Sequence, residues 1–246
     1  MKENITAILK YLLLYTGIFS TTLPLVFYLL YKRSSKEKSL RVILFYILYC
    51  IFNEGLGFYL QSIHSETFLI LLYSFTILEF SFFCLFIFVI IPESFVKRII
   101  RYLWLCFIIF YFIDLVFINK GKGFDSVAMG IECILVLFLC SSYLFLILRK
   151  SNNLFIYSTF EFWIVITFLI YFSGTFFLYI LAESMRDNLA FRGQYFIINI
   201  SFNLLKNVLL SIALTMKLSD TVNQQKNTIP DLDDDLFISE NVNFPN

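Results

Sequence analysis

Long apolar stretches alternate with short polar connections along most of this chain. A helix needs about 20 mostly apolar residues to cross the hydrocarbon core of a bilayer. Seven stretches have about that length, at residues 7–31, 42–62, 67–91, 99–118, 126–148, 155–182 and 195–217. They lack the alternation of a membrane β-barrel, so helices are the form that satisfies their backbone groups in lipid. The pattern predicts an all-α, polytopic integral membrane protein with seven transmembrane helices.

The composition supports this fold class. Of the 246 residues, 59% are hydrophobic and only 15% are charged. A soluble domain of this length cannot bury so much apolar surface, so the lipid bilayer is the expected partner. The net charge of +1 gives no bulk attraction to nucleic acid, which is not expected as a partner.

The distribution of Lys and Arg predicts the orientation, because short cytoplasmic loops carry an excess of both. The connections after the first, third and fifth stretches, together with the C-terminal side, hold twelve basic residues, and the other side holds six. The N-terminus is therefore expected outside and the C-terminus in the cytoplasm. The twelve are Lys32, Arg33, Lys36, Lys38, Arg41, Lys97, Arg98, Arg101, Arg149, Lys150, Lys217 and Lys226.

The composition changes after Lys217, which divides the chain into a membrane domain, 1–217, and a tail, 218–246. The tail is polar and acidic, and it lacks the apolar content to fold alone, so we expect a disordered cytoplasmic segment. The alternative is a docking segment for a cytoplasmic signalling protein. Its run of aspartates followed by Leu236, Phe237 and Ile238 resembles the acidic-hydrophobic pattern of segments that order on a partner.

Five carboxylates fall within the predicted spans, on five different helices. Glu79 is near the middle of its stretch, whereas Glu54 and Glu132 lie toward the outer half. Asp114 and Glu161 are close to the ends of theirs, so we expect them to reach interfacial water.

Lys206 is the one basic residue at comparable depth. A charge there costs roughly 2.5 kcal/mol or more on insertion scales, and a carboxylate partner removes much of that cost. Depth favours Glu79 as the partner, with Glu54 or Glu132 next.

Polar residues on the seventh stretch form a stripe on one face of the helix, and Lys206 lies beside that stripe. Asn199, Asn203, Asn207 and Ser211 follow one another at intervals of four, which places them on one side of a helix. We therefore expect a buried polar network that joins the second, third, fifth and seventh helices. Its predicted members, as a ligand-binding site or a polar network, are Glu54, Glu79, Glu132, Asn199, Asn203, Lys206 and Asn207.

This network has two interpretations. It can hold together helices that hydrophobicity alone does not assemble in lipid. It can also form a binding pocket or a proton path, because ionisable groups inside a membrane are candidate functional sites.

Other chemistry is largely excluded. The single histidine, His64, lies in a short predicted loop, and the chain has neither a CxxC pair nor a Gly-rich phosphate loop. We expect no catalytic site, no metal and no cofactor. A lysine in a seventh helix also resembles the retinal-binding lysine of microbial rhodopsins, but Phe202 stands where that family has an acidic residue one turn earlier. Retinal is therefore not expected.

A proline and several glycines in the predicted helices are relevant to the transport hypothesis, because transporters often interrupt helices near their substrate site. Pro24 is expected to kink the first helix, with neighbouring threonine hydroxyls satisfying a freed carbonyl. Gly55 and Gly57 suggest an irregularity in the second helix. Gly174 is expected to be a point of close helix packing.

Three stretches carry a family resemblance: residues 71–86, 162–181 and 198–214. They resemble a group of small, uncharacterised seven-helix integral membrane proteins of Bacteroidetes-type bacteria. The resemblance implies a multi-pass protein of the bacterial inner (cytoplasmic) membrane that works alongside histidine-kinase signalling. The counterparts of the recurring polar positions are Glu79, Ser173, Gly174, Asn203, Lys206 and Asn207.

Together these features favour a membrane sensor or signalling component that binds a small or lipophilic ligand within the helix bundle. The alternative is a small transporter or proton-coupled carrier. An enzyme acting on lipids is the least favoured class, because acid-base groups are few and the one histidine lies in a loop.

Overall fold

The structure is a computed structural model that describes residues 2–31, 37–63, 67–118, 126–150, 159–184 and 189–216. The whole tail, 218–246, lies outside the described residues, as do His64 and the loop lysines and arginines at 32, 33 and 36. The described chain forms seven α-helices, and α4 continues into a π-helical turn, η1. The helices are α1 (Lys2–Tyr31), α2 (Lys38–Ser62), α3 (Thr67–Ile90), α4 (Ser94–Ile113), η1 (Asp114–Ile118), α5 (Ser126–Lys150), α6 (Phe160–Ser184) and α7 (Leu189–Thr215).

The expected all-helical, multi-pass membrane architecture is confirmed in this coarse form. Within the described residues, six helices, α2 to α7, are long and apolar enough to cross a membrane. Three of them begin earlier than the sequence pattern predicts, α2 at Lys38, α4 at Ser94 and α7 at Leu189. The reason is that hydropathy marks only the part of a helix in the hydrocarbon core, whereas basic first turns extend into the interfacial region.

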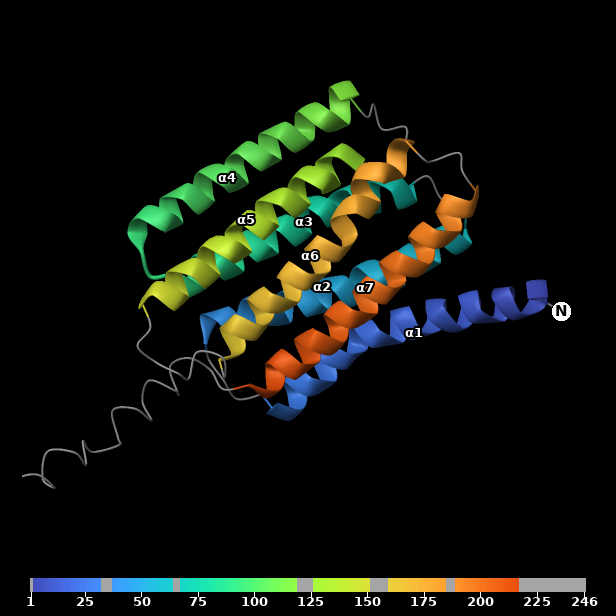
Figure 1. The fold of residues 1–246 in the computed structure, drawn as a ribbon, viewed down its shortest axis with the longest axis horizontal. Coiled ribbons are helices and arrows are strands. Elements are labelled where there is room, and N and C mark those ends of the chain that lie inside the picture. Colours follow the sequence, from blue (N-terminus) through green and yellow to red (C-terminus); the bar gives the residue numbers. More distant parts are fainter. Residues whose placement is uncertain are drawn as a thin grey trace, which may run out of the picture.

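The helices form an antiparallel bundle, with α1 and α4 at its two edges (Figure 1). The closest partners are α1 with α7, α2 with α3, and α6 with both α5 and α7. Because successive helices reverse direction, α2, α4 and α6 all begin at one end of the bundle. We call it the basic end, because it carries the exposed side chains of Lys38, Arg41, Arg98, Arg101 and Arg149.

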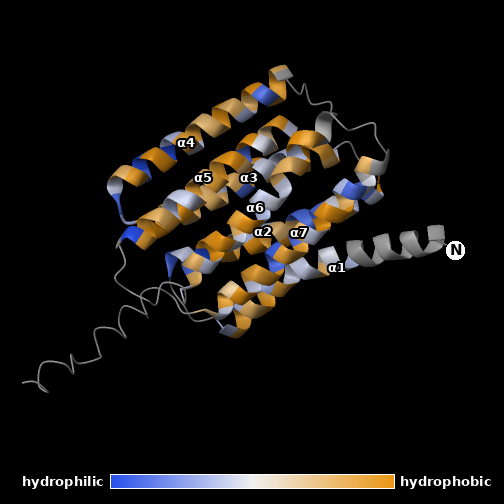
Figure 2. Cartoon of the chain, viewed as in Figure 1, coloured by the Kyte–Doolittle hydropathy of each residue, from blue (hydrophilic) through white to orange (hydrophobic). Residues whose placement is uncertain are grey.

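Large apolar side chains cover the outer surface of the bundle. Hydrophobic positions dominate every described helix from α2 on, and polar positions gather where α4 begins and α5 ends (Figure 2). Phe19, Leu30, Phe95 and Phe117 are among many exposed apolar residues. Water-soluble monomers rarely expose contiguous apolar surface of this extent, so the outer face is suited to lipid.

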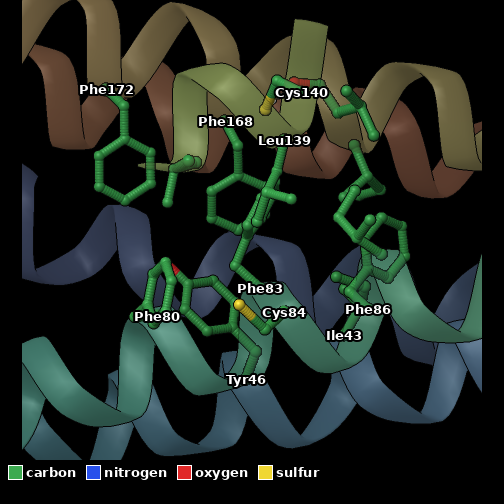
Figure 3. Close-up of a cluster of buried hydrophobic side chains, with 14 of the residues drawn as sticks. Ile43, Tyr46, Phe80, Phe83, Cys84, Phe86, Leu139, Cys140, Phe168 and Phe172 are labelled. Atoms are coloured by element: carbon green, nitrogen blue, oxygen red, sulfur yellow. Dashed lines mark hydrogen bonds between the residues drawn. The ribbon is translucent and has the colours of Figure 1, made fainter. Parts of the chain in front are cut away.

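Aromatic side chains fill much of the interior (Figure 3). Phe83 of α3 and Phe168 of α6 meet with ring centroids 5.1 Å apart, and Phe86 meets Phe160 at 6.4 Å. All four are nearly inaccessible to solvent. We call these four residues the aromatic layer. Edge-to-face pairs of this kind stabilise a core beyond their buried area.

The expectations about helix irregularities are only partly met. α2 runs without interruption through Gly55 and Gly57, so the predicted irregularity is wrong. α1 includes Pro24 within its length, but the hydroxyls before it donate to the carbonyls of Gly17 and Phe19. Those are not the carbonyl four residues before the proline, which is the one that a proline leaves without its helical bond.

Gly174 is a point of close packing, as expected. A Cβ atom added there would lie 2.0 Å from the ring of Phe202 on α7, far inside van der Waals contact. The absence of a side chain on α6 therefore lets the ring of α7 pack directly against its backbone. Small residues at helix interfaces serve this purpose in membrane bundles.

Candidate functional site

Lys206 of α7 and Glu79 of α3 form a buried ion pair near the middle of the bundle. The Nζ atom lies 3.3 Å from Oε1, and the two side chains are 3% and 5% exposed. The partner that depth favoured in the sequence is thus confirmed. A buried pair is stable only when its remaining donors and lone pairs are also satisfied, so the surrounding residues decide its role.

Two tyrosines complete the surroundings of the pair. The Tyr46 hydroxyl donates to Glu79 Oε1 at 2.7 Å and accepts from Lys206 Nζ at 3.0 Å. The Tyr171 ring faces the ammonium, whose Nζ is 4.2 Å from the ring centroid. A cation over a tyrosine face is attracted by the quadrupole of the ring, more strongly where water is excluded. These contacts account for a charge that lipid would otherwise penalise.

Neither tyrosine was singled out from the sequence, although a signal for both exists. Tyr46 precedes Cys50 by one helical turn and Glu54 by two, so it lies on the polar face of α2. On α6, Tyr171, Thr175 and Tyr179 also follow one another at intervals of four. The four-residue spacing of these polar side chains therefore marks the polar face of each helix.

Glu54 forms a second polar centre with different partners. Thr21 Oγ1 of α1 donates to Oε2 at 2.5 Å, and Asn203 Nδ2 of α7 donates to Oε1 at 3.2 Å. This carboxylate is therefore held by neutral donors, whereas Glu79 is held by a cation. Its bonds connect α2 to both α1 and α7.

The asparagine stripe on α7 connects three different helices. Asn203 bonds to α2 through Glu54, and Asn207 Nδ2 donates to Ser20 Oγ of α1 at 2.9 Å. Asn199 Oδ1 accepts from the hydroxyl of Tyr179 on α6 at 3.4 Å. The predicted single face therefore exists, and its members reach different neighbours because the helices surround α7 on that side.

The network includes two helices beyond those expected. Together with α2, α3 and α7, it includes α1 and α6 through Thr21, Asn207 and Tyr171. Glu132 of α5 is buried, and the Lys206 ammonium bonds to Glu79 and Tyr46. The expected participation of α5 through Glu132 stays a prediction.

Two further residues lie elsewhere than expected. Asp114 and Glu161, expected to reach interfacial water, are only 2% and 5% exposed. The error arises because distance from a helix end measures depth in the membrane and not depth in the protein. Ser173, named only for the family resemblance, is exposed and donates to Ile170 O within its own helix.

A cavity of about 590 Å³ opens at the basic end. Ser39 Oγ and Glu161 Oε1, on α2 and α6, lie 3.4 Å apart on its wall, which also includes the Tyr143 side chain of α5. Its lining comes from four helices and their connections: Glu37, Lys38, Ser39, Val89, Ile90, Ile91, Pro92, Glu93, Tyr143, Leu146, Ile147, Thr159 and Glu161. The sequence did not indicate this cavity, since its walls form only when four separate helix ends converge.

The aromatic layer separates the cavity from the ion pair. Glu161 on the cavity wall and Tyr171 beside the ammonium are ten residues apart on α6, about 15 Å along a helix. Phe168 lies between them, 5.1 Å from Phe83 and 5.4 Å from Tyr46 between ring centroids. Two polar regions at different depths are thus divided by tightly packed apolar side chains. Figure 3 shows three of these side chains, Phe83, Phe86 and Phe168.

Comparisons of the chain with protein-family models, curated proteins and solved structures found no match.

Proposed function

We propose that the chain is a membrane sensor or signalling component that binds a small molecule in the cavity at the basic end. The cavity carries this proposal: its volume of about 590 Å³ falls within the range of sites for small organic ligands, roughly 300–1,000 Å³. We further propose that the chain crosses a bacterial inner membrane seven times, with the basic end in the cytoplasm and the N-terminus outside; the excess of Lys and Arg at the basic end supports this orientation.

The lining suits a ligand with a polar group and an apolar body. Ser39 and Glu161 offer a hydroxyl and a carboxylate at one part of the wall, and Val89, Leu146 and Ile147 offer hydrocarbon. A ligand that bonds to Glu161 competes with Ser39 and so changes the contact between α2 and α6. Mixed walls with few convergent polar groups are typical of ligand sites.

We propose that ligand binding is reported to the cytoplasm at the basic end, through movement of the helices. The polar network fixes α7 to α1, α2 and α3, so movement of α2 is passed to the helix that leads into the tail. The tail, 218–246, is proposed as the docking segment for a cytoplasmic signalling protein, in line with the family resemblance to proteins that work beside histidine kinases.

A small transporter or proton-coupled carrier is the second candidate, and the Lys206–Glu79 pair favours it. Ionisable pairs at mid-membrane depth occur in proton paths of pumps and carriers. In this conformation the aromatic layer lies between the pair and the cavity, so a carrier would have to separate Phe83 from Phe168 during transport. The sensor needs no such opening, which is why we place it first.

Proton flux separates the two candidates. Purified chain in liposomes with an enclosed pH dye is given a potassium-valinomycin potential, and Glu79→Gln serves as the matched variant. A sensor gives the same slow leak for both proteins and for empty liposomes. A wild-type flux that Glu79→Gln abolishes would establish the carrier instead.

Native mass spectrometry tests the cavity. Chain extracted from its own membranes is expected to retain a small molecule that is lost in Leu146→Trp, which fills the cavity. Leu148→Trp is the matched control, because Leu148 is exposed on the same helix. Retention of the molecule in Leu146→Trp would place the ligand elsewhere.

A further inference from the structure

A second hollow lies between α3 and α4, on the side of the bundle away from the polar network. It has a volume of about 380 Å³ and is lined by Ser81, Cys84, Leu85, Phe88, Ile100, Arg101 and Trp104. Leu85 is 48% and Trp104 is 38% exposed, so the hollow opens sideways toward lipid and not toward an aqueous end. We call it the lateral groove.

The walls of the lateral groove are apolar along their length. Its two polar groups inside the bilayer bond to each other, with Trp104 Nε1 donating to Ser81 Oγ at 2.9 Å. The hydroxyl of Ser81 in turn donates to Ile77 O at 2.7 Å. Away from Arg101, the groove therefore offers a polar ligand few bonding partners, whereas a hydrocarbon chain needs none.

Positive charge gathers at the end of the groove nearest the basic end. Lys97, Arg98 and Arg101 occupy the first two turns of α4. Arg101 lines the groove, and Lys97 Nζ lies 5.1 Å from the ring centroid of Phe88, which lines it too. Long basic side chains at a helix end extend toward the interface while their stems stay on apolar surface. Their charges thus reach the depth of lipid phosphates.

We propose that the lateral groove binds an anionic phospholipid. One acyl chain occupies the space between α3 and α4, and the phosphate group bonds to the guanidinium of Arg101 and the ammonium of Lys97. The occupant is a lipid because the groove opens into the bilayer, where acyl chains surround it. The lipid is anionic because two cations converge at the headgroup end, and guanidinium groups bind phosphate oxygens in a bidentate manner.

Tryptophan fluorescence gives a direct test, because the chain has only two tryptophans. In Trp163→Phe the remaining emission comes from Trp104, which lines the groove. The protein is reconstituted in phosphatidylcholine liposomes that contain a small equal fraction of either brominated phosphatidylglycerol or brominated phosphatidylcholine. Bromine quenches tryptophan only at short range, so quenching reports which lipid occupies the groove.

The quenching of Trp104 is expected to indicate that the anionic brominated lipid is enriched about fivefold in the groove over the zwitterionic one. An enrichment of about fivefold corresponds to the attraction between one basic residue and an anionic membrane surface. Arg101→Gln is expected to remove most of this preference, and Lys97→Gln part of it. Arg149→Gln is the matched control, because Arg149 is exposed at the same end of the bundle on α5, and it should keep the full preference.

Three results would overturn the proposal. Equal quenching by both lipids would show that the headgroup is not recognised. Preference that survives both Arg101→Gln and Lys97→Gln would place the headgroup elsewhere. Loss of preference to the same degree in Arg149→Gln would indicate a diffuse surface charge. The Lys97→Gln variant decides the matter if Arg101→Gln does not fold, since Lys97 is not fully buried.

Discussion

α7 and α4 contribute candidate membrane spans of similar length, 23 and 24 residues, but they are held in the bundle by different means. α7 bonds through side chains to α1, α2, α3 and α6, using Asn199, Asn203, Lys206 and Asn207. α4 lies at an edge and contacts α3 through aromatic packing and two side-chain bonds, from Trp104 and Tyr111.

The difference follows from what drives association in lipid. Apolar side chains gain no hydrophobic free energy by leaving lipid for a protein interior, so packing and polar bonds must hold the helices. A helix at the centre of a polar network is therefore fixed in register, while an edge helix keeps faces open to lipid. The lateral groove beside α4 and the ion pair beside α7 are two consequences of the same physics.

The largest effect is expected from breaking the ion pair on α7. Lys206→Met or Glu79→Gln alone should destabilise the bundle by about 3–5 kcal/mol, because each leaves an uncompensated buried group. The double variant should recover part of that loss. Unfolding in detergent, analysed as a double-mutant cycle, measures the coupling between the two sites. Lys97→Met makes the same replacement on α4 and should change stability by less than about 0.5 kcal/mol. Strictly additive losses for Lys206 and Glu79 would contradict the pairing.

The next effect concerns the contact between α6 and α7. Gly174→Ala should destabilise by about 1–3 kcal/mol, because the new methyl group overlaps the Phe202 ring. Phe202→Leu in the same chain should relieve most of the loss. Gly55→Ala is the control, since a Cβ there meets nothing within 4 Å. Thermal unfolding in detergent distinguishes these variants, and equal stability of the two alanine variants would refute close packing at Gly174.

A smaller effect is expected from the asparagine stripe. Asn207→Leu removes two bonds to α1, which at typical intramembrane values costs about 0.6–1.7 kcal/mol. Ser201→Ala is the matched change on α7, because its hydroxyl bonds only to Ile197 O of its own helix. Equal melting temperatures of the two variants would mean that the bonds of Asn207 to α1 do not stabilise the bundle.

The smallest effect is expected on α4. Tyr111→Phe removes the bond from its hydroxyl to Tyr73 O but keeps the buried ring, and should cost about 0.6 kcal/mol or less. The same unfolding assay applies. A loss as large as that of Asn207→Leu would show that α4 depends on polar bonds as α7 does, and the contrast between the two helices would disappear.

The sequence predicted the ion pair of the candidate site but not the tyrosines around it. Lys206 and Glu79 are rare charges at matching depths in long apolar stretches, so electrostatic cost alone predicts that they pair. Depth placed Glu54 and Glu132 after Glu79 as possible partners, and the lysine bonds to Glu79. Depth is a coordinate along the membrane normal, and it does not say which helices are neighbours. Tyr46 and Tyr171 were missed because tyrosine is abundant here, and only its position on a polar face distinguishes it.

The sequence by itself determined the properties that depend on position along one helix. These are the helical fold class, the apolar outer surface, the polar stripe at Asn199, Asn203 and Asn207, and the preference of Lys206 for a carboxylate partner. Each follows from a local rule of hydrophobicity, periodicity or charge. The tertiary structure alone decided how the helices are arranged around one another. It placed α1 and α6 in the network, buried Glu161, and opened a cavity and a lateral groove. Such features depend on side-chain packing between segments far apart in the chain, which no local pattern specifies.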